Sequence, residues 1–477
     1  MARVAIIGAG FAGHTAAMYL GDALGKDHDI IMINRYHFFS YIPSWVWVGI
    51  GRMDSKKTTF PLRLVYNKMN VFFVEGKATE VHPDEQYVIV DKADGSGETR
   101  VDYDYLIVAT GPKLDFAATP GLGPDAGNSL SICTLPHAEQ TRDNYLAAVE
   151  RMEKGEKQKF VIGTGHGSAT CQGAAFEYVA NVAKDLVRRG VRDQAEIVFF
   201  SNEPELGDFG VRGVHAKMGD QILSSEDFMS AALNEYDIKW ELQKATLRVE
   251  KGRIFWEDLE GEQGETDFDF AMLIPRFLGV PLKYIGADGE DVSSKIVNAG
   301  GFVIVDGKYG RPWDEMAKDP ESWPAVYQNP NYENIFAAGI AFAPPGSISR
   351  PHINPNGISI TPAPPRTGMV SGIIGRIVAM NIIDLIEKGE MTHSERMTEM
   401  AAACIASMGD SLWDGSAAVI TIYPVVPDHQ RYPNDEGRDL FVTDMEMGLA
   451  GAWMKRMIHT TFMYKLQGRF GWKLIPE

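Results

Sequence analysis

Cysteine is scarce in this chain of 477 residues, which contains only Cys133, Cys171 and Cys404. Three scattered cysteines without a CxxC pair exclude a disulfide framework and a cysteine-ligated zinc site, and we expect no metal. Buried free cysteines often behave as small apolar side chains. Three chemically idle thiols are therefore the plain alternative to any redox role.

Basic residues are outnumbered by acidic ones, with 46 Lys and Arg against 64 Asp and Glu, so the net charge is −18 and the pI is near 5.1. This balance argues against nucleic acid as a partner, since binding phosphate requires a basic face. The chain starts MARVAIIGAG, without a basic segment followed by an apolar one, so no cleaved signal peptide is predicted. No apolar run approaches the roughly 18–20 residues that a helix needs to cross a bilayer. We expect a protein that does not span a membrane, although it can lie on one.

A glycine-rich turn follows the first predicted strand. The apolar run at 4–8 leads into GAGFAG at 8–13, an apolar-rich helix to about residue 24, and the strand DIIMIN at 29–34. GxGxxG between a strand and a helix is typical of a dinucleotide site, because the glycines allow a tight turn and close approach to a pyrophosphate. The helix N-terminus adds a partial positive charge. The pattern predicts an α/β fold that binds a dinucleotide.

The second strand ends in Asn34, where an acidic residue usually holds the ribose hydroxyls. An amide can also form hydrogen bonds to those hydroxyls, and Arg35 is suited to the phosphate on the adenosine side of the dinucleotide. ATGPK at 109–113 and NIFAAGIAF at 334–342 end two further strands in glycine. The predicted cofactor-binding residues are Gly8, Ala9, Gly10, Phe11, Ala12, Gly13, Asn34, Arg35, Ala78, Thr110, Gly111, Gly339 and Gly368.

A second strand, glycine turn and helix recur at 160–188, with the turn reading GTGHGSATC, and EIVFFSN at 196–202 is the next strand. The repeat predicts a second Rossmann-like unit inserted into the first. The predicted divisions are 1–150 and 286–385 for the first domain, 151–285 for the second, and 386–477 for a C-terminal region.

Cys171 stands near the start of the helix in the second unit. A helix N-terminus favours the thiolate, so the sequence predicts a lowered pKa and a reactive sulfur. Glu177, about two turns along, is a candidate proton relay, although a solvated or salt-bridged helix acid is the alternative. Cys404 is far along the chain, so only tertiary structure can bring it to Cys171.

The motifs GAGFAG, ATGPK, CTLPHAE (133–139), CQGAAFEY (171–178), NIFAAGIA and CIASMGD (404–410), in this order, resemble the sulfide:quinone oxidoreductases among the two-dinucleotide-domain flavoproteins. The resemblance implies FAD, sulfide as electron donor, a membrane quinone as acceptor, and Cys171 and Cys404 as a redox pair bridged by a disulfide or extra sulfur. It also allows covalent attachment of FAD through Cys133, or a role of Cys133 in handling product. His137, four residues later, is a candidate proton donor or a packed histidine.

The stretch 447–476 is basic and rich in aromatic residues. This composition predicts a segment that lies at a bilayer surface, making the protein a peripheral, monotopic membrane protein; a solvated helix or an oligomer contact is the alternative. By the resemblance, Lys455, Ile405 and Ile458 are candidates for the quinone site. Ile405 departs from the aromatic residue that often follows the third cysteine in the family.

Other departures are Asp208, where the family often has a histidine, with His215 as a candidate substitute. The segment 344–366 contains seven prolines, which predict a stiff irregular loop that covers the sulfur site or is structural. Three alternatives stay open: a type II NADH:quinone oxidoreductase, the flavin subunit of a cytochrome-linked sulfide dehydrogenase, and a non-enzymatic flavin redox sensor. The first requires an intact nicotinamide pocket at 163–173.

Overall fold

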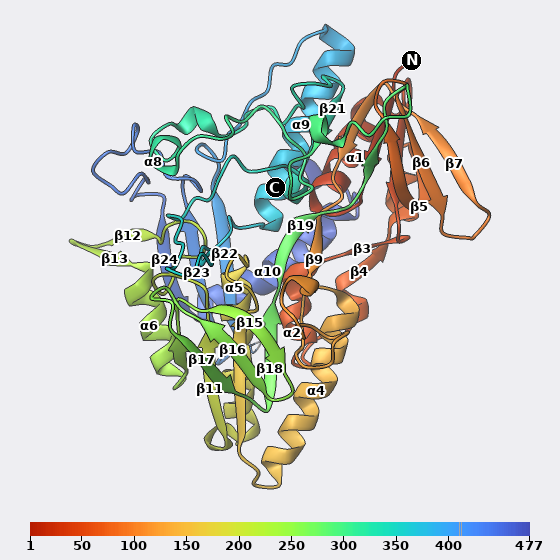
Figure 1. Cartoon of the computed structure of the whole chain (residues 1–477). Coiled ribbons are helices and arrows are strands. Elements are labelled where there is room, and N and C mark those ends of the chain that lie inside the picture. The colour runs from red at the N-terminus through yellow and green to blue at the C-terminus, as the bar shows by residue number, and fades with distance from the viewer. Residues whose placement is uncertain (410, 412) are drawn as a thin grey trace.

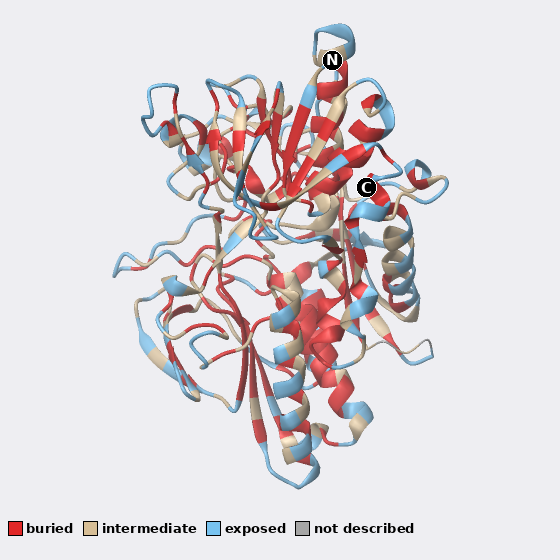
Figure 2. Ribbon diagram, turned by 90° about the vertical axis from the view of Figure 1, so that its right-hand side faces the viewer, coloured by how far each residue is buried: buried red, intermediate tan, exposed pale blue. Residues whose placement is uncertain are grey.

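The computed structural model describes residues 1–409, 411 and 413–477 (Figure 1). Asp410, the last residue of CIASMGD, lies outside the described residues. Two largely parallel sheets form the centres of two lobes. Buried residues follow the strands of both sheets and the helices packed on them (Figure 2).

The first sheet contains the N-terminal glycine turn. Its path is β21 (Ile335–Ala337), β8 (Tyr105–Val108), β1 (Arg3–Ile7), β2 (Asp29–Asn34), β5 (Val71–His82), β6 (Tyr87–Lys92) and β7 (Glu98–Asp102). The first five strands are parallel, and β21 joins them from more than 200 residues away. Helix α1 (Phe11–Leu24) packs against α9 (Gly368–Lys388). A Cβ at Gly375 would lie 2.2 Å from the carbonyl oxygen of Ala12, so glycine permits this close contact.

The second sheet is fully parallel, in the order β14 (Lys239–Glu241), β11 (Ala195–Phe200), β10 (Gln158–Thr164) and β18 (Phe270–Ile274). Helix α5 (Gln172–Arg189) follows β10 through the second glycine turn. The predicted strand, turn, helix and strand are present, so both Rossmann-like units are found. The chain passes between the lobes along the antiparallel pair β9 (Pro112–Asp115) and β19 (Arg276–Gly279). The four domain limits stay a prediction.

The C-terminal region forms an antiparallel sheet of β22 (Ala402–Met408), β23 (Ser416–Ile422) and β24 (Asp444–Gly448), on which α10 (Leu449–Leu466) packs. Strand β22 also packs against α5. The remaining elements are β3 (Phe38–Ser40), α2 (Trp45–Val48), β4 (Thr59–Pro61), α3 (Leu62–Tyr66), α4 (Leu135–Glu153), β12 (His215–Met218), β13 (Gln221–Ser224), α6 (Ser225–Glu235), β15 (Ala245–Glu250), β16 (Arg253–Glu257), β17 (Gln263–Asp267), β20 (Lys283–Tyr284), α7 (Ser293–Ile296) and α8 (Trp313–Met316), with 3-10 turns between them.

Helix α9 corrects one expectation from the sequence. Among the described residues, this is the one helix that is long enough and apolar enough to cross a membrane, judged by length and composition. The expectation that no segment reaches that length is therefore wrong. However, 72% of its most apolar window is buried inside the protein, where it packs on α1. Its surroundings are those of a core helix.

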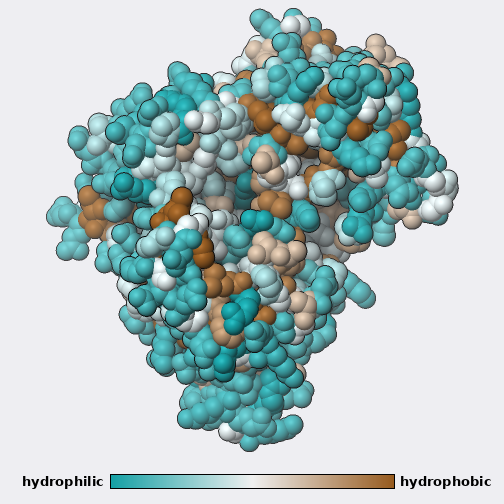
Figure 3. All heavy atoms as spheres, in the orientation of Figure 1, coloured by the Kyte–Doolittle hydropathy of each residue, from teal (hydrophilic) through white to brown (hydrophobic). Residues whose placement is uncertain are grey.

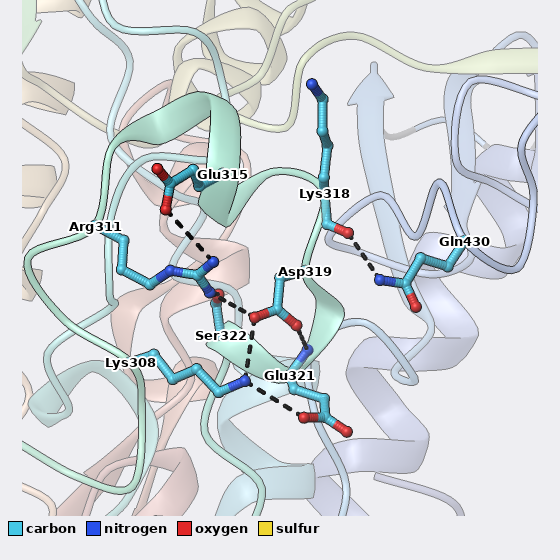
Figure 4. Close-up of polar contacts among 8 residues, drawn as sticks. All are labelled: Lys308, Arg311, Glu315, Lys318, Asp319, Glu321, Ser322 and Gln430. Carbon is cyan, nitrogen blue, oxygen red and sulfur yellow. Dashed lines mark hydrogen bonds and ion pairs between the residues drawn. The ribbon is translucent and has the colours of Figure 1, made fainter.

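A polar network holds the segment around α8 (Figure 4). Asp319 accepts hydrogen bonds from Lys308 and Arg311, and Gln430 donates to the carbonyl oxygen of Lys318 at 2.9 Å. Burial by itself would raise the pKa of Asp319, but the hydrogen bonds from Arg311 and Lys308 outweigh it and lower this pKa. The network fixes an irregular segment to the loop near residue 430.

Replacing Asp319 with Asn should lower the free energy of unfolding at pH 7 by about 1 kcal/mol, because two charge-assisted hydrogen bonds are lost at a partly exposed site. A depressed carboxyl pKa stabilises the fold above the unfolded pKa, and the contribution disappears as pH falls through the folded pKa. The difference from wild type should therefore shrink below about pH 4 in urea titrations. Glu315→Gln, at a more exposed carboxylate 3.7 Å from Arg311, is the matched control with a smaller effect. Equal stability of wild type and Asp319→Asn at pH 7 would contradict the role of the network.

Candidate active site

The predicted cofactor residues gather at the carboxyl ends of three adjacent parallel strands. Gly8 follows β1, Thr110 and Gly111 follow β8, and Gly339 follows β21. Ligands bind at this edge in open α/β sheets. Gly8 has φ +103°, and a Cβ there would lie 2.3 Å from the carbonyl oxygen of Ala109. Only glycine fits this turn.

Two helix N-termini point to an anionic ligand at the same edge. Helix α1 starts after Gly10 and α9 after Thr367, and neither residue forms a side-chain capping bond. The buried Thr367 hydroxyl has no hydrogen-bond partner among the described residues. A Cβ at Gly10 or Gly111 would meet no atom within 4 Å, which leaves open space beside the backbone. The residues therefore fit the pyrophosphate and polar ring edge of FAD.

The other predicted cofactor residues lie around this edge. Asn34 accepts a hydrogen bond from the backbone N–H of Ala9 at 3.0 Å and donates to Tyr36, so its amide holds the glycine turn in place. Arg35 is exposed. Strand β5 continues past the end of β2, where Asn34 pairs with Glu75, and this extension includes Ala78. Phe11 faces Gly368, and Ala12 and Gly13 form the tight contacts of α1.

The three cysteines lie around the start of α5. Cys171 is the residue before the helix and has the left-handed conformation, with φ 66°. A Cβ at Gly173 would lie 3.3 Å from the Cys404 sulfur on β22. Cys171 is close enough to both Cys133 and Cys404 that a charge on its sulfur would raise the pKa of each. All three are free thiols in this structure, so it does not describe the bridged form expected for Cys171 and Cys404.

Burial decides the pKa values of these thiols. It raises the pKa of Cys171 to about 11, against the nearby Arg366 and Thr170, which lower it. Burial also raises the pKa of Cys404 to about 11 and that of Cys133 to about 12. The predicted lowering at Cys171 is wrong, because desolvation of the charged sulfur outweighs the helix N-terminus.

Glu177 and Lys455 form a buried ion pair beneath β22. The Lys455 ammonium lies 2.9 Å from Glu177 and donates to the carbonyl oxygen of Ile405 at 2.8 Å. Glu177 also accepts hydrogen bonds from the backbone and hydroxyl of Ser407. Ile458 packs with Ile405 in the same region. Glu177 is thus salt-bridged rather than solvated, and the ion pair lies directly beside the Cys404 strand.

A polar cluster that was not predicted from the sequence lies beside this ion pair. The Ser44 hydroxyl lies 2.8 Å from Nδ1 of His459, and the ring of Tyr41 lies edge-on to His459 at 5.3 Å. Glu177 is close enough for its charge to raise the pKa of Tyr41, although burial is the larger cause. Burial lowers the pKa of His459, and Lys455 adds to this. No local motif links residues 41–44 to α10, so spacing gave no signal.

The second glycine turn is filled by the protein itself. A Cβ at Gly167 would lie 2.2 Å from the carbonyl oxygen of Ser359, and a Cβ at Gly165 would lie 2.6 Å from Leu122. The side chain of Asn202 donates to the carbonyl oxygens of Gly167 and Ala169. These atoms occupy the space beside the turn that a pyrophosphate would need.

Glu203 lies just past β11, close to where a Rossmann unit places its ribose-binding acid. Its carboxylate accepts hydrogen bonds from Ser201 at 2.7 Å and from the backbone of Phe209 at 2.8 Å. Burial raises the pKa of Glu203 to about 8. The acid is therefore turned inward and stabilises the local fold.

Three other predicted positions, Asp208, His137 and His215, are packed within the protein. Asp208 is buried and accepts hydrogen bonds from the Ser349 hydroxyl and the Gly210 backbone, which fix the proline-rich segment. His137 contacts the ring of Phe116 at 5.7 Å, and burial lowers its pKa. The Nδ1 atoms of His137 and of His215 are buried without a hydrogen-bond partner among the described residues.

Comparison with known proteins points to a flavoprotein class for this fold. Residues 2–190 match the family described as pyridine nucleotide-disulphide oxidoreductase. A sulfide-quinone reductase of Aquifex aeolicus (strain VF5) is 29% identical over 91% of this chain and 87% of its own. An external alternative NAD(P)H-ubiquinone oxidoreductase B3 of Arabidopsis thaliana is 21% identical over 47% of this chain and 43% of its own.

Two solved structures have the same fold. The sulfide:quinone oxidoreductase from Aquifex aeolicus superposes with TM-score 0.78 at 27% identity, covering 98% of this chain and 92% of that one. NDH2 from Plasmodium falciparum in complex with NADH gives TM-score 0.66 at 12% identity, covering 99% and 97%. The protein is an FAD-dependent oxidoreductase with the fold of the pyridine nucleotide-disulphide oxidoreductases. Over most of its length it is similar to the sulfide-quinone reductase of Aquifex aeolicus.

Proposed function

We propose that the protein oxidises sulfide through Cys171 and Cys404 and passes two electrons by way of FAD to a membrane quinone. The observation that carries this proposal is the gathering of three cysteines at the start of α5, beside a glycine turn filled by the protein itself. The reactive groups at this turn are therefore cysteine sulfurs, in the place where a nicotinamide would lie in an NADH-binding relative. The likeness to the Aquifex aeolicus enzyme supports the same substrate pair.

In the oxidised form, Cys171 and Cys404 are joined by a disulfide or a longer sulfur bridge. Hydrosulfide attacks the Cys171 sulfur, a new S–S bond forms, and the bond to Cys404 breaks. Cys171 then holds a persulfide and Cys404 is released as the thiolate, which keeps atoms and charge balanced. Lys455 lies near enough for its charge to lower the pKa of Cys404, against the larger effect of burial. Closing the bridge again between the Cys171 persulfide and the Cys404 thiolate would release one proton and two electrons, and the electrons would pass to FAD. Repeated cycles would lengthen the sulfur chain to polysulfide.

FAD supplies a two-electron acceptor between the thiolate and the quinone. Gly8, Gly10 and the start of α1 would hold its pyrophosphate, and the start of α9 at Thr367 and Gly368 would face the polar edge of its ring. Cys133 is a candidate for covalent attachment or for product handling. The desolvated Cys133 thiol, with its pKa near 12, would have to lose its proton before it could attach.

We propose the quinone site between β22 and α10, near Lys455, Ile405 and Ile458. An ammonium group has three hydrogens, and Lys455 donates to Glu177 and to the carbonyl oxygen of Ile405. The ammonium lies 2.9 and 3.0 Å from the two carboxylate oxygens of Glu177, so a quinone carbonyl would take the place of one of these contacts. Tyr41 and His459 lie in the same cluster and would supply polar contacts around it.

The C-terminal segment would bring this site to a bilayer surface. Helix α10 exposes Trp453, Met457 and Tyr464, and the residues after it expose Phe470 and Leu474. Apolar and aromatic residues on a basic helix suit the headgroup boundary. On the face shown in Figure 3, apolar residues interrupt the hydrophilic surface near the junction of the lobes, where further contact is possible. The protein would then be a monotopic membrane protein.

The NADH-oxidising alternative is less well supported, because Ser359, Leu122 and Asn202 fill the space beside the second glycine turn. A cytochrome-linked enzyme would need no exposed apolar helix face near the quinone site. A redox sensor would bind FAD without turning over sulfide.

The test is anaerobic stopped-flow absorbance of the FAD-loaded protein. Sulfide alone should bleach the flavin within seconds, and a short-chain quinone should restore its colour, while NADH should leave it oxidised. Bleaching by NADH but not by sulfide would overturn the proposal. Bleaching by sulfide without recovery by quinone would favour a different electron acceptor.

A further inference from the structure

The proline-rich segment pairs directly with the second glycine turn. The backbone N–H of Thr361 donates to the carbonyl oxygen of Gly167 at 2.8 Å, and that of Ala363 donates to Ala169 at 3.1 Å. The Thr170 hydroxyl donates to the carbonyl oxygen of Pro364 at 2.9 Å. The two segments thus advance two residues at a time in the same direction, toward Cys171.

The next steps of this pairing bring Arg366 to Cys171. Pro364 and Pro365 have no N–H, so the first backbone donor after Ala363 is that of Arg366. This N–H comes near enough to the Cys171 sulfur to lower its pKa, which favours the charged form. The position of Arg366 therefore follows from the register of the pairing.

The Arg366 guanidinium has no carboxylate partner among the described residues. It donates to the carbonyl oxygen of Ile340 at 2.8 Å and lies over the ring of Phe302 at 4.6 Å. Burial lowers the pKa of Arg366 to about 10, and the charge of Cys171 raises it. A desolvated cation held only by carbonyl groups and an aromatic face is stabilised strongly when an anion comes beside it.

We propose that Arg366 is the counter-ion of the anionic sulfur on Cys171, whether thiolate or terminal persulfide. This rests on the proposed sulfide oxidation. The guanidinium and the backbone N–H belong to one residue, and both favour the charged form of the Cys171 sulfur. When hydrosulfide forms the new S–S bond on Cys171, the persulfide proton is released to solvent and Arg366 holds the remaining negative charge. A persulfide kept anionic has already lost the proton that must leave when the bridge to Cys404 is closed again and two electrons pass to FAD.

The experiment measures the pKa of Cys171 directly, without sulfide or quinone. In the FAD-loaded Cys133→Ser/Cys404→Ser protein, Cys171 is the only cysteine, and its rate of alkylation by iodoacetamide is followed against pH by mass spectrometry. Arg366→Gln should raise the pKa of Cys171 by at least about 1 and slow alkylation at pH 8 by roughly tenfold, as expected for loss of a nearby opposite charge. Arg366→Lys should keep most of the wild-type pKa, because it keeps the charge.

The matched control is Arg376→Gln, which removes a guanidinium on α9 that lies 3.5 Å from the carboxylate of Glu395. It should leave the pKa of Cys171 unchanged. Equal pKa values in Arg366→Gln and the parent protein would overturn the proposal, as would an equal rise in Arg376→Gln. If Arg366→Gln does not retain FAD, Arg366→Met and Arg366→Lys provide the same comparison. If the protein fails to oxidise sulfide but Arg366→Gln still raises the pKa of Cys171 as expected, only the proposed function is contradicted.

Discussion

Replacing Cys171 or Cys404 with Ser should slow sulfide-dependent reduction of the flavin by about 10³-fold or more, the loss typical of removing a covalent nucleophile. A hydroxyl cannot form the S–S bond that stores the sulfur, so the effect falls on chemistry rather than on binding. Cys404 lies beside Gly173 at the start of α5, so the two residues act at one place. Anaerobic stopped-flow absorbance of each variant, mixed with sulfide, measures the rate.

The control for this experiment is Ser168→Ala, a substitution in the same glycine turn at a partly exposed side chain. It should retain FAD and sulfide-dependent reduction within about twofold of wild type, as expected for a substitution away from buried contacts. Chemical reduction by dithionite should bleach every variant equally. If Cys171→Ser and Cys404→Ser both reduce normally with sulfide, the cysteine mechanism is wrong.

Lys455→Met should destabilise the protein by about 3–5 kcal/mol, because removing one partner leaves Glu177 as an uncompensated buried charge. Glu177 would keep only the hydrogen bonds from Ser407. Glu177→Gln should destabilise the protein less than Lys455→Met does. The amide carries no charge, and Lys455 keeps its hydrogen bond to the carbonyl oxygen of Ile405. The free energy of unfolding is measured by urea titration of the FAD-loaded protein.

Combining the two changes should recover much of the lost stability, since neither buried charge then remains. The matched control is Lys473→Met, which removes a lysine of the same C-terminal segment from an exposed pair with Asp22. An exposed ion pair contributes about 0–1 kcal/mol, so this variant should stay near wild type. A Lys455→Met protein as stable as Lys473→Met would contradict the buried pair. Loss of quinone-dependent reoxidation in the stable double variant would support a direct role at the quinone.

Much of the fold could be predicted from short stretches of sequence. The turns after β1 and β10 were found because glycine spacing between a strand and a helix is a local property of the backbone. Their predicted strands and helices agree with the structure to within a few residues. The apolar helix at 368–388 was missed, because Arg376 interrupts the apolar run and its burial against α1 is not visible in sequence.

The sequence by itself determined the two dinucleotide-type units, the position of Cys171 at a helix start and the basic, aromatic C-terminal segment, since each depends on neighbouring residues. Only the tertiary structure decided that Cys404 lies beside Gly173, that Lys455 pairs with Glu177 across 278 residues, and that Arg366 lies at Cys171. It also reversed the predicted pKa of Cys171. The physical reason is the same in each case: packing brings distant residues together and removes water, and desolvation then outweighs the local preference of a helix terminus.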